Sequence, residues 1–386
     1  MPRSALAAIL GLALLFSGCA LVRPAPPAEP PVGTIIDARD GRVVSRDELA
    51  RRLNQARVVV VGESHTHPGH HQVQLDVLKM MERDPAPLVV VVEWLPHPVQ
   101  PVCDEFSAGK LSLDQFARQV DWPKRWGYPL NLYAAILTRV QQKGHRLVAA
   151  NAPLAVIRKL AHQGLRDLTP PERRQLAPSL DLAPGSYRRR LLAAAAAHGI
   201  TDRSRQEDFV IAQIARDETM AHHLAAALLP WPDNPRRALL LTGGGHLDRG
   251  QGVVPRIARR LPGVDMVTVM PLSRGSQRMV PGPGQGPVVA DYLVVTAPAP
   301  RPPRLGIIIK PQAGGIRIVR VLPGSRAQAA GMRAGDLMVA IDGQKIATPR
   351  DIFTIIIKAP YQPHRYRLQR GGHPVDITIT IPRPRR

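Results

Sequence analysis

The stretch VVVVGESH, residues 58–65, decides the fold class of this chain. Four consecutive valines, with no alternation of polar and apolar residues, are typical of a strand buried on both faces of a parallel sheet. Further apolar runs occur at 88–92, 146–150, 238–242 and 265–269, with longer segments between them. This alternation predicts an α/β domain with a parallel sheet covered by helices on both faces.

The segments between these runs have helical spacing or are interrupted by proline. Helices are expected within 72–81, 131–143 and 206–229. Residues 98–130 and 153–200 are polar, punctuated by proline and rich in helix-forming residues. We therefore expect these two segments to form a helical cap subdomain at one end of the sheet.

Side chains that can bind a ligand or transfer a proton follow four of the expected strands. Glu63 and His65 follow the first strand, Glu93 the second, Asn151 the third and His246 the fourth. In open parallel sheets, ligands bind at the carboxyl ends of the strands, so these side chains should meet at one site. Histidine and carboxylate together can ligate a transition metal or act as acid and base.

Composition limits the class of protein. The chain has 386 residues, of which 44% are hydrophobic, so it can bury a substantial core. Its net charge is +22, from 52 Lys and Arg against 30 Asp and Glu. No helix-turn-helix, zinc-finger or RNA-binding signature accompanies this charge, so we expect no nucleic-acid partner. An anionic membrane surface or an anionic ligand is consistent with it.

The N-terminus resembles a bacterial lipoprotein signal peptide over residues 1–18. A short positive start precedes an apolar run at 5–16, which is too short to span a bilayer, and the tetrapeptide FSGC ends at Cys19. The alternative is an ordinary signal peptide with a chance cysteine. Lipidation of Cys19 would leave Cys103 without an intrachain partner, so we expect no disulfide. A Pro-rich tether at 19–32 would then follow the anchor.

Six short motifs follow one another in a specific order within residues 33–298. They are VVVVGESHTHPGHH from residue 58, VVVEWLPHPVQPVC from 90, WGYPLNLY from 126, LVAANAPL from 147, DFVIAQIARDETMAHH from 208 and LLLTGGGHLDRG from 239. In this order they resemble the ChaN family, bacterial iron-regulated lipoproteins associated with haem binding and uptake, in a superfamily with the erythromycin esterases and the Tiki metalloproteases. The resemblance implies an α/β domain, a smaller helical subdomain, and haem held at a dimer interface.

The chemistry of haem suggests a role for particular residues of the candidate site. Ferric haem needs an axial His or Tyr, an apolar slot, and cations for its propionates. His65 and Tyr128 are the preferred ligand candidates. Trp122 and Trp126 near Tyr128 can supply apolar walls, or they can pack in the core. Arg216 can meet a propionate or a site carboxylate. The full candidate set for haem or metal is Glu63, His65, Glu93, Tyr128, Asn151, Arg216 and His246.

The C-terminal part resembles a bacterial PDZ domain over residues 305–383, after a Pro-rich linker at 299–304. The motifs that carry the resemblance are RLGI from residue 304, PGSRA from 323 and GMRAGDLMVAIDGQKI from 331. The resemblance implies that the backbone of Leu305, Gly306 and Ile307 holds a peptide C-terminus, while the peptide adds a strand to the sheet edge. A groove helix is expected at 350–358.

Three functions are compatible with these patterns. The favoured one is a membrane-tethered haem-binding lipoprotein in haem uptake or iron acquisition, anchored to the outer membrane facing the periplasm. Its PDZ module would bind a partner, and haem binding would make it a homodimer. The second is a metal-dependent hydrolase in which Glu63, His65, Glu93 and His246 hold a divalent transition metal. The third is a non-catalytic periplasmic adaptor. No nucleophile elbow, Walker motif or dinucleotide fingerprint supports another chemistry.

Overall fold

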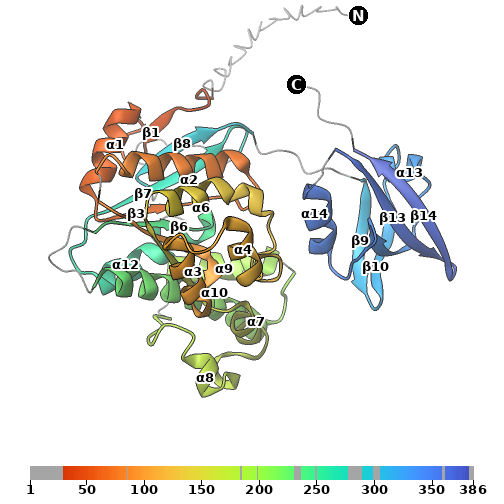
Figure 1. Cartoon of the computed structure of the whole chain (residues 1–386). Helices are drawn as coiled ribbons and strands as arrows, with labels where there is room; N and C mark the ends of the chain where they lie inside the picture. The colour runs from red at the N-terminus through yellow and green to blue at the C-terminus, as the bar shows by residue number, and fades with distance from the viewer. Residues whose placement is uncertain are drawn as a thin grey trace, which may run out of the picture.

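The structure is a computed structural model that describes most of the chain. The predicted signal peptide, Cys19, most of the predicted tether and the linker at 299–304 lie outside the described residues. Figure 1 shows a large α/β domain and a smaller β-rich C-terminal domain. Among the described residues, no helix combines the length and apolar character needed to cross a membrane. The described ranges are 29–84, 86–182, 185–197, 199–229, 236–247, 250–276, 289–298, 305–358 and 361–381.

The large domain is built on one eight-stranded sheet with the order β2-β1-β8-β7-β3-β6-β4-β5. All five apolar runs form parallel strands, as predicted, and β8 continues the parallel part. The sheet is mixed rather than purely parallel, because β1 pairs antiparallel with both β8 and β2. A short turn joins β1 to β2, and such a connection permits only antiparallel pairing. The strands are β1 Ile35–Asp37, β2 Val43–Val44, β3 Val58–Val61, β4 Val89–Pro96, β5 Arg146–Asn151, β6 Ala238–Leu241, β7 Met266–Ser273 and β8 Tyr292–Thr296.

Helices cover both faces of this sheet. In β3, Val59 and Val61 pack into one core cluster, while Val58 and Val60 pack into the cluster on the opposite face. This explains why the strand has no polar position. The first face carries α1 Arg46–Gln55, α2 Pro68–Met81, α3 Gln100–Ser107, α4 Leu113–Gln119 and α6 Ala134–Gln142. The second carries α10 Arg203–Leu228, α11 Gly244–Leu247 and α12 Val253–Arg260.

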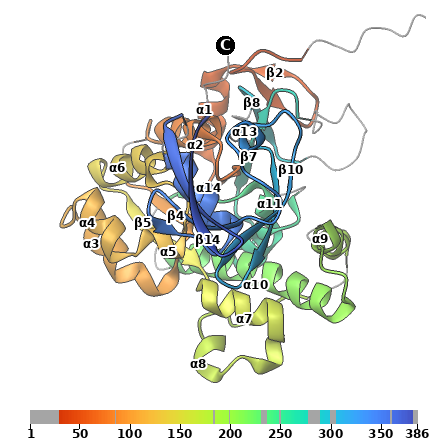
Figure 2. The ribbon, with the colours of Figure 1, turned by 90° about the vertical axis from the view of Figure 1, so that its right-hand side faces the viewer.

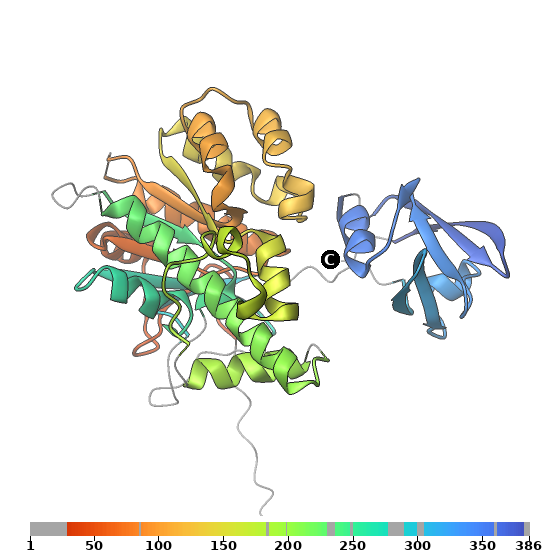
Figure 3. The same ribbon diagram turned by 90° about the horizontal axis from the view of Figure 1, so that it is seen from below.

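The two predicted insertions form helices, and Figure 2 shows α3 and α4 of the first apart from α9 Ser186–Ala197 of the second. Figure 3 shows α10 as a long helix crossing the domain, with α9 and α7 Leu154–Gln163 packed against it. The helices expected within 72–81, 131–143 and 206–229 correspond to α2, α6 and α10. The additional helices are α5 Trp122–Arg125, α7 Leu154–Gln163, α8 Pro170–Arg173 and α9 Ser186–Ala197.

The outer edge of β5 is closed by side chains of α3. Gln100 Nε2 donates to the carbonyl of Leu147 at 2.9 Å, and the Ala149 N–H donates to Gln100 Oε1 at 2.8 Å. The Leu147 N–H donates to Ser107 Oγ at 2.9 Å. These three bonds satisfy buried backbone groups that a further strand would otherwise pair.

The small domain has the strand order β14-β13-β11-β10-β9, with β12 also paired to β11. Its edge strand β9 begins directly after the Leu305–Gly306 turn. The groove helix predicted at 350–358 is present as α14, one residue longer at its start. Ile352 and Ile355 of α14 share a core cluster with Ile307 and Ile309 of β9. The elements are β9 Ile307–Gln312, β10 Gly315–Val321, α13 Arg326–Ala329, β11 Leu337–Ile341, β12 Gln344–Lys345, α14 Pro349–Lys358, β13 Pro363–Arg370 and β14 His373–Thr380.

Candidate functional site

Glu63, His65, Glu93, Arg216 and His246 lie near one another at the carboxyl ends of the parallel strands, and we call them the strand-end cluster. Glu93 is its centre, and the Glu93 side chain is fully buried in β4. Its Oε2 accepts hydrogen bonds from the Gly243 N–H at 2.5 Å and from Thr242 Oγ1 at 2.9 Å. Its Oε1 accepts from Arg216 Nη2 of α10 and lies 3.3 Å from His246 Nε2 of α11. Three elements that are distant in sequence therefore meet on one carboxylate.

The network continues behind His246, away from the cavity. Its Nδ1 lies 2.7 Å from Asp217 Oδ1, and Tyr187 of α9 donates its hydroxyl to Asp217 Oδ2 at 2.5 Å. Burial alone would lower the pKa of His246, but the carboxylates of Glu93 and Asp217 outweigh it and raise this pKa to about 9. Burial would likewise raise the pKa of Glu93, and the cations of His246 and Arg216 hold it well below its usual value. Arg216, Glu93, His246 and Asp217 therefore form a row of alternating positive and negative charges, which holds the Arg216 side chain in position.

His65 belongs to a second, adjoining group. Its Nδ1 is 2.7 Å from Glu63 Oε1, while His71 Nε2 is 3.2 Å from Glu63 Oε2. Burial acts to lower the pKa of His65, yet the bond to Glu63 and the nearby charge of Glu93 raise it overall. A side chain at Gly243 would place its Cβ only 2.8 Å from His65 Cε1, which explains the glycine there. Glu63 therefore orients an imidazole that leaves Nε2 available for a ligand.

A cavity of about 510 Å3 opens in front of His65, whose side chain is 28% exposed. The His65 ring lies 4.8 Å from the Trp126 ring and 4.9 Å from the Tyr128 ring, measured between centroids. Both aromatic residues come from the first predicted insertion, so the cap completes the site begun by the strands. The cations that line the cavity are Lys124, Arg125, Arg158 and Arg216.

Asn151 and Trp122 have structural partners. Asn151 lines the cavity, but its Nδ2 donates to the Glu93 carbonyl at 2.9 Å and its Oδ1 accepts from the Ala152 N–H at 2.9 Å. This ties the end of β5 to β4. For Trp122 an apolar wall and core packing were both open; it packs in the core, and its Nε1 donates to the Tyr128 carbonyl at 2.8 Å. Trp122 thus supports the position of Tyr128.

Sequence reasoning missed Asp217, Thr242 and Tyr187. Asp217 follows Arg216 directly and is fully buried, as are Glu218 and Thr219 after it. Together with Arg216 they interrupt the mostly apolar part of α10 that begins at Phe209, and this interruption is a signal that could have identified Asp217. Tyr187 lies in the second insertion, where no local pattern marks it.

The described residues contain no group of three or more His, Cys, Asp or Glu side chains arranged to hold a metal ion. The four predicted metal ligands lie near one another, but the two oxygens of Glu93 are already engaged by protein donors. His246 is likewise held on both ring nitrogens, by Glu93 and Asp217. The arrangement therefore favours an organic ligand in the cavity over an ion within the network.

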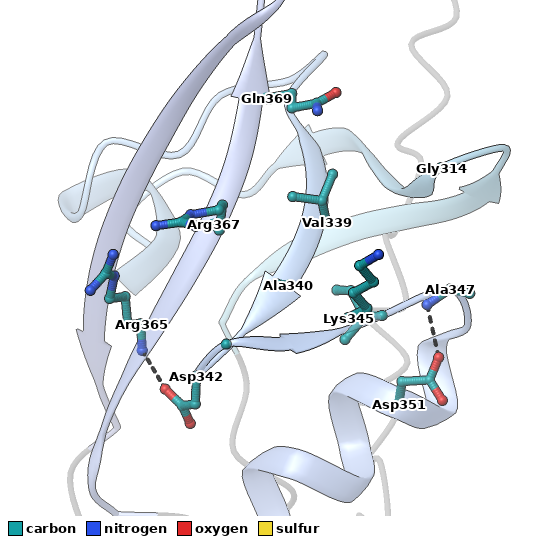
Figure 4. Close-up of a pocket in the computed structure, with 12 residues that line it drawn as sticks. Gly314, Val339, Ala340, Asp342, Lys345, Ala347, Asp351, Arg365, Arg367 and Gln369 are labelled. Carbon is teal, nitrogen blue, oxygen red and sulfur yellow. Dashed lines mark hydrogen bonds between the residues drawn. The ribbon is translucent and has the colours of Figure 1, made fainter.

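A larger cavity, of about 1180 Å3, lies on the outer face of the PDZ sheet (Figure 4). Arg365 and Arg367 line it, but Asp376 accepts hydrogen bonds from both guanidinium groups. Asp342 accepts from the backbone N–H of Arg365 at 2.8 Å. Because its two arginines are paired with Asp376 and it is remote from the strand-end cluster, we assign no ligand to it.

The loop expected to bind peptide is pinned by backbone bonds. The Leu322 N–H donates to the Gly306 carbonyl at 2.8 Å, and the Ala327 N–H donates to the Leu305 carbonyl at 3.0 Å. Gly306 has φ +80°, and a Cβ on it would lie 2.2 Å from Ser325 Cβ. Only glycine fits this position.

Fold and site together define a class: an α/β ligand-binding domain whose cavity lies at the carboxyl ends of parallel strands, followed by a PDZ fold. The sequence model described as "Haem-binding uptake, Tiki superfamily, ChaN" matches residues 49–257, and the chain belongs to this family. A PDZ domain model matches residues 317–370. The large domain is thus a ChaN haem-binding domain, and the small one is a peptide-binding module by class.

Known proteins support this assignment at the level of fold. A structure described as cofacial heme binding to ChaN of Campylobacter jejuni superimposes with a TM-score of 0.54 at 17% identity, covering 69% of this chain and 98% of that one. Protein RETICULATA-RELATED 5, chloroplastic, of Arabidopsis thaliana is 22% identical over 278 residues, which are 64% of this chain and 35% of that protein. HhoA of Synechocystis sp. is 36% identical over 72 residues, or 18% of each chain. This chain therefore spans only a minor part of the curated relatives it matches.

Proposed function

We propose that this protein is a membrane-tethered haem-binding lipoprotein of the cell envelope that serves haem uptake, and that its PDZ domain binds the C-terminus of a partner. The observation that carries the proposal is the cavity at the strand ends, into which His65 opens between two aromatic rings. Family membership supplies the class of ligand, and the structure supplies residues suited to it.

The residues around the cavity fit the requirements of haem. His65 offers Nε2 as an axial ligand, because its Nδ1 is held by Glu63. Tyr128 is the second ligand candidate, and Trp126 provides an apolar wall. Arg125 and Arg158 line the cavity as partners for propionates. Bound haem would supply an iron centre; the protein's part is to orient the imidazole and neutralise the carboxylates.

A haemin titration tests this proposal. The wild-type chain should shift the Soret band, and His65→Ala or Tyr128→Phe should alter that spectrum. His373→Ala is the matched control, because His373 is exposed in the PDZ domain. Spectra like the wild type in both variants would remove these two residues as ligands. Light scattering on the same samples tests whether haem produces the expected homodimer.

The second candidate function is a metal-dependent hydrolase. The observation that favours it is the short contact between Glu63 and His65, since a histidine that ligates a metal through one ring nitrogen usually donates the other N–H to a carboxylate. Metal analysis of the purified protein and a screen for ester or peptide hydrolysis discriminate the two functions. Stoichiometric metal with hydrolysis, and no haem binding, would favour this candidate.

Membrane tethering depends on Cys19 and has its own test. Cys19→Ser should release the protein from the membrane fraction, because Cys19 is the residue placed for acylation. Cys103→Ala is the matched control, since that cysteine is buried in the core and should leave the anchor intact. Unchanged membrane partition of Cys19→Ser would contradict the lipoprotein assignment.

A further inference from the structure

The outer face of the β9–β10 hairpin combines exposed apolar side chains with cations. Ile308 is 40% exposed and Val319 is 51% exposed, and Leu322 just beyond β10 is 38% exposed. Large apolar residues exposed together in this way mark interaction surfaces more often than isolated ones do. This patch borders β9, which is the terminal strand of its sheet.

The register of the hairpin shows which side chains share this face. Ile308 pairs with Arg320, and Lys310 pairs with Arg317. Directly opposed residues of antiparallel strands point to the same face, so all four lie on the outer side. Their neighbours Ile309 and Ile318 form the next pair, and Ile318 is fully buried on the inner side.

The cations of this face are not neutralised by the protein. Within the described chain, neither Lys310 nor Arg320 makes an ion pair or a side-chain hydrogen bond. Arg317 donates only to neutral oxygens, those of Gln312 and the Gly335 carbonyl. Residues 307–321 contain no acidic side chain at all. The outer face next to the open edge is therefore positively charged and lacks an internal counter-charge.

A peptide that adds to β9 would present its side chains alternately to the two faces. Its last residue, held at the Leu305–Gly306 turn beside Ile307, would point inward to the apolar layer of Ile307, Ile352 and Ile355. The residues one and three places upstream would then point outward, alongside Ile308 and Lys310. An acidic side chain at either place would meet the unpaired cations.

We propose that the PDZ domain selects C-terminal peptides with an apolar last residue and acidic side chains one and three places before it. Lys310 and Arg320 are the specificity-determining residues. This inference rests on the proposed peptide binding and adds the class of peptide. Because the ion pairs formed are exposed, each acidic position should tighten binding about three- to fivefold, and added salt should reduce the gain.

Fluorescence anisotropy of the full chain with labelled decapeptides tests the proposal. The peptides share a C-terminal valine and differ only at the two upstream positions, which carry Glu, Gln or Lys. The expected order of affinity is Glu above Gln above Lys, over about tenfold or more in total. The double variant Lys310→Glu with Arg320→Glu should reverse this order. Lys110→Glu is the control, because it changes an exposed lysine of the large domain.

The possible failures are distinguishable. Equal affinity for all peptides would overturn the inference and leave peptide binding itself in place. An absence of binding to every peptide would contradict both. A third outcome is that all peptides bind equally, while the chain binds vesicles that contain anionic phospholipid and the double variant does not. This outcome would assign the patch to a membrane surface and overturn its role in peptide selection.

Discussion

The two candidate binding regions of this molecule are built from different parts of the chain. The strand-end site of the large domain consists of side chains, and the buried network from Arg216 through Glu93 to Asp217 fixes their positions. The PDZ site consists mainly of backbone, offered by the edge of β9 and by the turn at Gly306. The first region therefore depends on which side chains are present, and the second on the path of the main chain.

This difference determines how each site tolerates substitution. Loss of one group in the strand-end network leaves a buried charge without its partner, which is costly at that site. Most outward side chains of β9 can change without moving the backbone, so the PDZ site should tolerate them and adjust only its selectivity. Glycine positions are the exception in both regions, because there the main chain itself is constrained.

The largest expected effect is that of Gly306→Val on the PDZ site. The new side chain would collide with Ser325 and would force a positive φ on a β-branched residue, so peptide affinity should fall more than 100-fold. Haem binding should not change. Anisotropy and haemin titration on the same variant measure both.

Gly314→Ala is the matched control for that variant. Gly314 also has a positive φ, of +83°, but a Cβ there meets nothing within 4 Å. Near-normal peptide binding is expected. If Gly314→Ala were as damaging as Gly306→Val, backbone strain rather than the contact with Ser325 would be the cause.

The second prediction is that the two domains differ in acid stability. Burial lowers the pKa of His70 to about 3 and also lowers that of His145, so both are neutral in the folded large domain. Above about pH 6.5 such a histidine is neutral in both the folded and the unfolded state, so its burial has no protonation cost. As the pH falls below about 6.5, the unfolded state binds a proton that the folded state does not, and the free energy of unfolding decreases until the folded-state pKa is reached. In the PDZ domain, the bonds from Arg367 and Arg365 lower the pKa of Asp376 to about 2, a contribution lost only below about pH 4.

The large domain should therefore lose stability first, between pH 6.5 and 4. All four tryptophans precede residue 232, so tryptophan fluorescence during urea unfolding follows the large domain alone. Amide NMR signals of β13 and β14 follow the PDZ domain. A PDZ domain that weakens at the same pH as the large domain would show that the contrast is wrong.

The third prediction concerns Gly243→Ala. Its Cβ would press on His65 Cε1 at 2.8 Å and on Glu93 Oε2 at 3.3 Å, so haemin affinity should fall about tenfold while peptide binding is unchanged. Gly245→Ala is the control, because a Cβ at Gly245 meets nothing within 4 Å. Equal haemin affinity in the two variants would mean that the position of the His65 ring does not limit binding.

The smallest expected effect is that of removing residues 305–386 on haemin affinity. If the sites are independent, this affinity should change less than twofold, although all binding to C-terminal peptides is lost with the PDZ domain. Calorimetry of the full chain and the truncated chain, side by side, measures this. A loss of haemin affinity beyond about tenfold, or roughly 1.4 kcal/mol, would show that the PDZ domain helps to form the haem site.

The parallel strands, and the proximity of most candidate residues, could be predicted because each of these strands carries its signal locally. The four valines at 58–61 show burial on both faces, and the polar residue that follows each strand shows which edge of the sheet it occupies. The same pattern predicts that Glu63, His65, Glu93 and His246 lie near one another, which they do, although Glu93 lies within β4 rather than after it.

The features of the fold and site that could not be predicted depend on contacts between residues that are distant in sequence. The antiparallel β1 could not be predicted, because three residues carry too little pattern to mark a strand or its direction. Tyr187 reaches Asp217 only because α9 packs on α10. Trp122 and Trp126 are four residues apart, equally apolar and both buried in the core, yet only Trp126 also lines the cavity.

The glutamine and serine of α3 that cover β5 have a consequence for assembly. A bare sheet edge invites another chain to continue the ladder, which is how many aggregates and strand-sharing dimers begin. Here the carbonyl of Leu147 and the N–H of Ala149 are already engaged by Gln100, and the far end of the sheet finishes in the two-residue strand β2. Both edges therefore disfavour an association of two large domains by extension of their sheets. A contact between two copies is expected to use side-chain surfaces, where shape and charge rather than the shared backbone decide which partner fits.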